Sequence, residues 1–135
     1  MRDSKADAAL MRQRIRACED ACDALIKASE DCADACLDLN GDEENTTCFL
    51  AALDCVEISL AAARVLSWTT STHHTSAIAI LDACLRCCAV STAACERMAV
   101  LHAPWITCTA ACQRLSTACS NLLRLMQQTQ SQPTN

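Results

Sequence analysis

The chain has 135 residues, of which 52% are hydrophobic and 20% charged, and its formal net charge is -5 at pH 7. This length suffices for one domain with a packed core, and the acidic balance offers no basic patch, so we expect no nucleic-acid partner. One Gly, two Pro, one Phe and no Tyr leave little material for strands and tight turns, which predicts an all-α fold.

Apolar periodicity predicts four helices in chain order. The first runs from about Ser4 to Leu39 and ends before the only glycine, Gly41, which we expect to act as its C-terminal cap. The second covers about Asn45 to Trp68 and is followed by the polar connection "TTSTHHTS". The third covers about Ser76 to Leu101, and the fourth runs from Pro104 to about Gln128.

Four helices with short connections predict an up-down-up-down four-helix bundle. We expect one domain over residues 1–128 and a disordered polar tail over residues 129–135. The N-terminal residues are charged and contain no apolar segment with a cleavage site, and no apolar run approaches the roughly 20 residues that span a bilayer. The prediction is a soluble, cytoplasmic protein with reduced thiols and no membrane partner.

Cysteine spacing is the strongest pattern in the chain. At about 100° per residue, every cysteine falls on one stripe of its helix, and in a bundle these stripes face the common axis. The thirteen cysteines are Cys18, Cys22, Cys32 and Cys36 on the first helix, Cys48 and Cys55 on the second, Cys84, Cys87, Cys88 and Cys95 on the third, and Cys108, Cys112 and Cys119 on the fourth. The thiols are therefore predicted to line the core.

Three interpretations of these thiols compete with a copper site. One or two cysteines are ordinary small core residues, but thirteen in place of Leu and Ile would weaken packing without a compensating role. A disulfide framework fits poorly because neighbours at i and i+4 project in parallel, although cross-helix pairs stay possible. Zinc and iron-sulfur sites need about four converging ligands, whereas these thiols are strung along an axis; clustered zinc thiolates remain an alternative.

Cu(I) suits the spacing best. It is soft, prefers thiolate and accepts few ligands, so two sulfurs at i and i+4 can close on one ion. Four pairs have this spacing: Cys18 with Cys22, Cys32 with Cys36, Cys84 with Cys88, and Cys108 with Cys112. A thiolate with a monovalent ion is close to neutral, and without metal the thiols can stay protonated, so the bundle could fold first and fill later.

The segments "ACEDAC", "CADACLD", "LDCVEISLAAARVLS", "DACLRCC", "CERMAVLH" and "CTAACQRLSTAC" together resemble the cytosolic copper storage proteins, over about Arg14 to Leu123. The resemblance implies a tetramer of bundles, each holding many Cu(I) ions through thiolates, with no catalytic turnover. Such proteins often carry further cysteines at positions occupied here by other residues, namely Leu25, Ser29, Ser59, Ser91, Trp105 and Leu115. A reduced storage capacity is expected from these differences.

Copper storage or buffering is the favoured function. A copper chaperone or sensor, and a thiol-rich structural or redox bundle without metal, remain the alternatives. No catalytic constellation stands out, because His73 and His74 lie in a polar connection where solvated histidines are expected, so we predict no enzyme. Asp54 flanks the stripe, where a hydrogen bond within the bundle and a surface carboxylate are equally compatible with the sequence.

The ends and the outer surface of the bundle carry further expectations. Met98 and His102 continue the stripe of the third helix beyond Cys95, and we expect them to collect copper at one mouth of the core. Large apolar side chains should plug the opposite end, namely Met11, Leu66 and Met126. An additional apolar sector on the second helix predicts a homo-oligomer; it comprises Phe49, Leu53, Val56 and Leu60.

Overall fold

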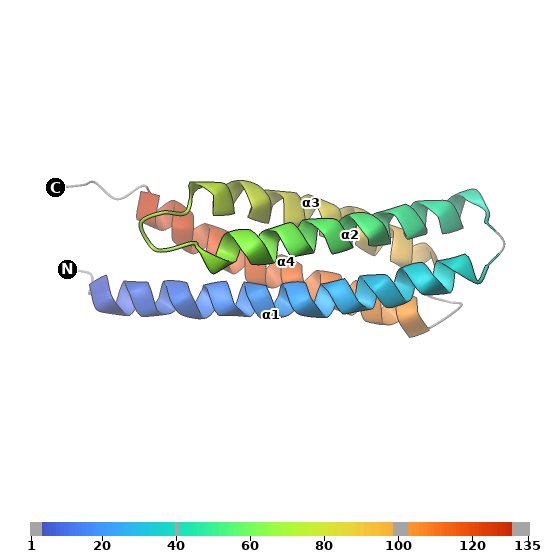
Figure 1. Ribbon diagram of the computed structural model, residues 1–135, viewed down its shortest axis with the longest axis horizontal. Coiled ribbons are helices and arrows are strands. Elements are labelled where there is room, and N and C mark those ends of the chain that lie inside the picture. Colours follow the sequence, from blue (N-terminus) through green and yellow to red (C-terminus); the bar gives the residue numbers. More distant parts are fainter. Residues whose placement is uncertain (1–3, 40, 99–102, 131–135) are drawn as a thin grey trace.

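A computed structural model describes residues 4–39, 41–98 and 103–130, and these residues form four helices without a strand. The helices are α1 (Ser4–Leu37), α2 (Glu43–Ser67), α3 (Thr75–Met98) and α4 (Ala103–Gln130). In Figure 1 they lie side by side, and α1 and α3 each pack against both α2 and α4. The predicted up-down-up-down four-helix bundle is confirmed.

Helix boundaries differ from the predicted ones by a few residues. Helix α2 begins earlier because Asp42 caps it, its carboxylate accepting the Asn45 backbone N–H at 2.7 Å. Helix α4 ends at Gln130, two residues into the expected tail, and the Thr129 hydroxyl donates to the Leu125 carbonyl at 2.9 Å. The predicted last turn of the third helix, residues 99–101, and the tail residues 131–135 lie outside the described residues.

Gly41 does not cap α1 in the way the sequence suggested. The helix stops at Leu37, and the N–H groups of Asp38 and Leu39 bond to the carbonyls three residues before them, each at 3.3 Å. Gly41 has no positive φ. A tightened last turn therefore satisfies the carbonyls that a left-handed glycine would otherwise serve.

Helix α3 is long and apolar enough, by length and composition, to cross a membrane, which the sequence analysis did not expect. The reason is compositional, because many Ala and Cys residues along the helix make it apolar although it carries the ion-paired Asp82 and Arg86. In the bundle the inward side of α3 packs against its two neighbours.

Three large apolar side chains are buried toward one end of the bundle. There α1 begins, α2 and α4 end, and Met11, Leu66 and Met126 have exposures of 2%, 1% and 0%. The predicted position of this apolar plug is confirmed. His73 is exposed as expected, but His74 is buried, with Nδ1 3.3 Å from the Thr70 carbonyl, so the prediction of two solvated histidines is wrong for His74.

Candidate metal centre

All thirteen cysteines lie in the described part of the chain, and none forms a disulfide. Twelve are buried, as the stripe geometry predicted. Cys87 is the exception, because it lies at the flank of the α3 stripe, on the side that faces α2, and is half-exposed. The prediction that every thiol lies inside the core is therefore wrong for Cys87.

The most compact thiol cluster lies toward the end where α1 passes into α2. Cys32, Cys36 and Cys48 have sulfurs within 4.8 Å of one another, and Cys32 forms a second such group with Cys95 and Cys108. The Cys32 sulfur is 3.8 Å from that of Cys48 and 4.0 Å from that of Cys95. All four helices thus contribute to these two groups, which share Cys32.

These distances suit metal coordination without rearrangement. Two sulfurs that each bind one ion at about 2.3 Å lie at most about 4.6 Å apart. The separations from the Cys32 sulfur to those of Cys48 and Cys95, 3.8 and 4.0 Å, fall below this limit. Cys48 from another helix lies beside the i, i+4 pair of Cys32 and Cys36, so the groups that could hold a metal are assembled across helices as well as along them.

A second group occupies the middle of the bundle. The sulfurs of Cys55 and Cys87 are 3.4 Å apart, from α2 and α3. Cys112 interacts with both Cys55 and Cys88, and also with Cys108 of the cluster described above. The thiols of the two groups therefore form one continuous network.

A third group lies nearer the plugged end. Cys84 interacts with Cys22 and Cys119, and Cys119 also interacts with Cys18. Leu25 and Leu115 are fully buried in the same core. These four thiols come from α1, α3 and α4.

Hydrogen bonding among thiols and burial shift their pKa values in opposite directions. The S–H groups of Cys32 and Cys95 stabilise a thiolate at Cys48 and lower its pKa, and those of Cys119 and Cys22 do the same for Cys84. Donation to Cys84 and burial raise the pKa of Cys22, while burial raises the pKa of Cys36 to about 11. Most thiols are therefore protonated at neutral pH in the metal-free core.

The non-cysteine positions of the stripe are all buried: Leu25, Ser29, Ser59, Ser91, Trp105 and Leu115. Two of the serines join the thiol network. The Ser91 hydroxyl is 3.9 Å from the Cys95 sulfur and 4.0 Å from that of Cys108, and the Ser29 hydroxyl is 3.9 Å from Cys108. These hydroxyls occupy places where a further thiol would reach the same cluster.

Met98 is buried at the end of α3, pointing into the core, with an exposure of 4%. His102 lies outside the described residues. Trp105 is fully buried near this end, where it lowers the pKa values of Cys36 and Cys48. From the sequence, Trp105 was identified only as a stripe position without cysteine. Helical spacing predicts that a residue faces inward, but it does not predict which thiols that residue contacts.

The pairing of Cys55 with Cys87 was also missed. The two residues are separated by 32 positions and lie on different helices. No i, i+4 spacing marks them, and the register between α2 and α3 is needed to bring them together. Asp54, which the sequence left open, is exposed at the surface.

The comparisons with known proteins agree with this architecture. The sequence profile of the copper storage protein family matches residues 11–124. A comparison with curated protein sequences gave no match.

Two solved structures from Streptomyces lividans are similar in fold and sequence. A cytosolic copper storage protein with five coppers is 32% identical, with a TM-score of 0.80, 86% of this chain covered and 97% of that one. A structure of the copper storage protein Ccsp loaded with 10 copper equivalents is 32% identical, with a TM-score of 0.77 and coverage of 83% of this chain and 85% of that one. With its thiol-lined four-helix core, this chain belongs to the copper storage protein family.

Proposed function

We propose that this protein stores multiple copper ions as Cu(I), bound by the cysteine thiolates inside the bundle. The observation that carries the proposal is the network around Cys32, where two groups of three buried sulfurs lie within 4.8 Å of one another. Soft, thiolate-rich sites of low coordination number favour Cu(I) over harder ions. All thirteen cysteines are proposed as ligands.

The capacity of the protein tests this function. About one ion per bridging thiolate gives on the order of ten Cu(I) per chain. The number would be smaller if the stripe positions without cysteine interrupt some clusters. The metal-free protein would be titrated anaerobically with Cu(I) in the presence of a Cu(I)-specific chelator, and bound copper counted after separation. Fewer than about three tightly bound ions per chain would rule out the storage function. One or two bound ions would support a copper chaperone or sensor. No bound ion would support a structural or redox bundle.

The family role and the buried ligands both favour storage without catalysis. The related Streptomyces lividans proteins are described as cytosolic copper storage proteins, and we extend that location to this chain. A reducing cytosol keeps the thiols available for metal. A copper-loaded sample that retained all of its ions while catalysing no thiol oxidation would agree with this role, and catalytic turnover would contradict it.

Copper exchange at the mouth of the bundle is assigned to Met98 and His102. The buried position of Met98 at the end of α3 supports this assignment. A thioether and an imidazole bind Cu(I) more weakly than a thiolate, so they can collect an ion and pass it inward. Replacing both residues with Ala should slow loading and removal with almost unchanged capacity, and unaltered stopped-flow rates would refute this assignment.

A further inference from the structure

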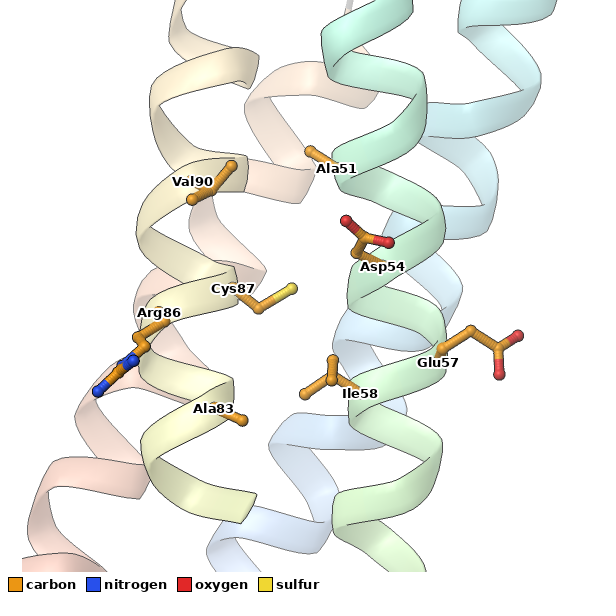
Figure 2. Close-up of a pocket in the computed structure, with 8 residues that line it drawn as sticks. All are labelled: Ala51, Asp54, Glu57, Ile58, Ala83, Arg86, Cys87 and Val90. Atoms are coloured by element: carbon orange, nitrogen blue, oxygen red, sulfur yellow. The ribbon is translucent and has the colours of Figure 1, made fainter. Parts of the chain in front are cut away.

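A groove on the side of the bundle exposes the thiol network to solvent. It has a volume of about 330 Å³ and lies between α2 and α3. Small residues, Ala51 and Ala83, leave the seam between the helices open, while Ile58 and Val90 line it with apolar surface. Figure 2 shows Cys87 with its sulfur directed from α3 toward α2, inside this groove.

The exposed thiol is paired with a buried one. The Cys87 sulfur lies 3.4 Å from that of Cys55, and Cys55 is 1% exposed. Cys55 interacts in turn with Cys112, and Cys112 with Cys108. A chain of thiols therefore leads from the side surface to the cluster around Cys32 without passing through either end of the bundle.

The charges at the groove favour a cation. Asp54 and Glu57 belong to its lining, and in Figure 2 the Asp54 carboxylate lies beside the opening. Arg86 also belongs to the lining, but it forms an ion pair with Asp82 at 3.1 Å on the exposed side of α3, and Figure 2 shows its side chain directed away from Cys87. A second groove, between α1 and α4, is lined by Gln113 and Arg114 among others and has no cysteine in its lining.

We propose that Cys87 and Cys55 form a lateral transfer site, at which a thiol-bound Cu(I) donor of neutral or positive charge hands its copper to the core. This inference rests on the proposed storage function and adds a route through the side of the bundle. Cells hold Cu(I) as thiolate complexes, so uptake requires ligand exchange at an accessible thiol, and Cys87 is the accessible one.

The exchange is balanced without a redox reagent. The Cys87 thiol loses its proton and its sulfur forms a bond to Cu(I), while one donor sulfur leaves and takes up that proton. Cys55 replaces the second donor sulfur in the same way. Copper remains Cu(I), both donor sulfurs leave as thiols, and the ion is held between α2 and α3 next to Cys112.

Initial loading rates test the site. The full-length Cys87→Ser variant and a matched Cys119→Ser variant, which removes a fully buried thiol outside the groove, would be loaded anaerobically by stopped flow. The donor is the Cu(I) complex of a basic synthetic peptide with a CxxC motif. Cys87→Ser should load at least about threefold more slowly than Cys119→Ser, while both lose at most about one ion of capacity.

A second variant keeps every thiol. Ala83→Leu fills the groove and should slow loading at unchanged capacity, whereas Ala89→Leu, at an exposed position on the same helix outside the groove, should load like the unmodified protein. Equal rates for Cys87→Ser and Cys119→Ser, or for the two leucine variants, would overturn the lateral site. Storage itself would still stand in that case, because it fails only if the unmodified protein binds fewer than about three ions.

Discussion

Single residues decide how many ligands the core offers. Ser29 and Ser91 place hydroxyls within 4.0 Å of cysteine sulfurs in the cluster around Cys32. Serine and cysteine are nearly the same size, so these positions are already shaped for a thiol. Leu25 and Leu115, in contrast, fill core volume with carbon and offer no ligand.

Ser91→Cys should raise copper capacity by about one ion, because its sulfur would lie beside those of Cys95 and Cys108. Anaerobic titration against a Cu(I) chelator measures the change. Ser67→Cys is the control, since Ser67 is exposed at the end of α2 and its hydroxyl bonds to the Arg64 carbonyl at 2.6 Å. A gain of equal size in both variants would show that the core position has no special role.

Trp105 should report copper binding at one cluster. It is fully buried and interacts with Cys36 and Cys48, whereas Trp68 is 64% exposed at the other end of α2. In a Trp68→Phe variant, indole emission should therefore fall steeply as Cu(I) is added. A Trp105→Phe variant should show little change, and equal quenching in the two would place the responding metal away from this cluster.

At the scale of helices, the connection between α1 and α2 is coupled to the thiol cluster. Asp42 caps α2, and the Asn45 side chain donates to the Cys36 carbonyl at 3.0 Å. The cap thus supports the turn of α2 that carries Cys48. Local hydrogen bonds at a helix end therefore help to position the thiols of this cluster.

Asp42→Ala should lower the free energy of unfolding of the metal-free protein by about 1 kcal/mol, because the Asn45 backbone N–H loses its acceptor. Urea unfolding followed by circular dichroism measures this. Asp42→Asn retains a capping oxygen and should recover most of the loss. If the two variants are equally destabilised, charge near the helix start, rather than the cap bond, explains the effect.

At the scale of the whole bundle, copper binding is coupled to the protonation of the core thiols. Thiolate is needed for copper binding, yet interaction with neighbouring thiols and burial raise the pKa values of Cys22, Cys88 and Cys119. Cys48, Cys84 and Cys108 are the exceptions, because hydrogen bonds from neighbouring thiols lower their pKa values. Filling the core must therefore displace most of its thiol protons.

Copper loading near pH 7 should release close to one proton for each thiol that was protonated before binding. Because these raised pKa values lie above neutral pH, apparent copper affinity should increase as pH rises and decrease as it falls. A pH-indicator dye in weak buffer, with copper supplied by a donor of known proton uptake, measures the release. Loading without net proton release would mean that the metal-free core already holds thiolates throughout.

We propose that this chain forms a homo-oligomer through α2, with the tetramer implied by its resemblance to cytosolic copper storage proteins. The sector identified on this helix is only partly covered, with Leu53 and Leu60 exposed to 41% and 45% and Phe49 and Val56 half-buried. Apolar surface of this kind on a helix flank is typical of a subunit contact.

Replacing both Leu53 and Leu60 with Lys should dissociate the assembly, because two charges would lose their hydration at a contact. Light scattering should then give the 14.5 kDa monomer. Leu37→Lys is the control at an exposed leucine near the end of α1. A monomer at all concentrations in the unmodified protein would contradict the oligomer.

Local periodicity was enough to predict the helices, the bundle and the inward direction of nearly all cysteines. A side chain's position around a helix follows from its place in the chain, since each residue adds about 100° of rotation. For the same reason the plug of Met11, Leu66 and Met126 was placed correctly. The prediction that Gly41 caps α1 was wrong, because a tightened turn satisfies the carbonyls at the end of that helix.

Contacts between helices depend on their relative register and rotation, which packing of the complete core decides. Spacing along α1 pairs Cys32 with Cys36, but only the assembled bundle brings Cys48, Cys95 and Cys108 to the same sulfur. It likewise rotates Cys87 to the flank of α3, beside Cys55 and open to the groove. The tertiary structure therefore decided which thiols lie close enough to share an ion and where the core meets solvent, because both require distances between segments that no periodicity encodes.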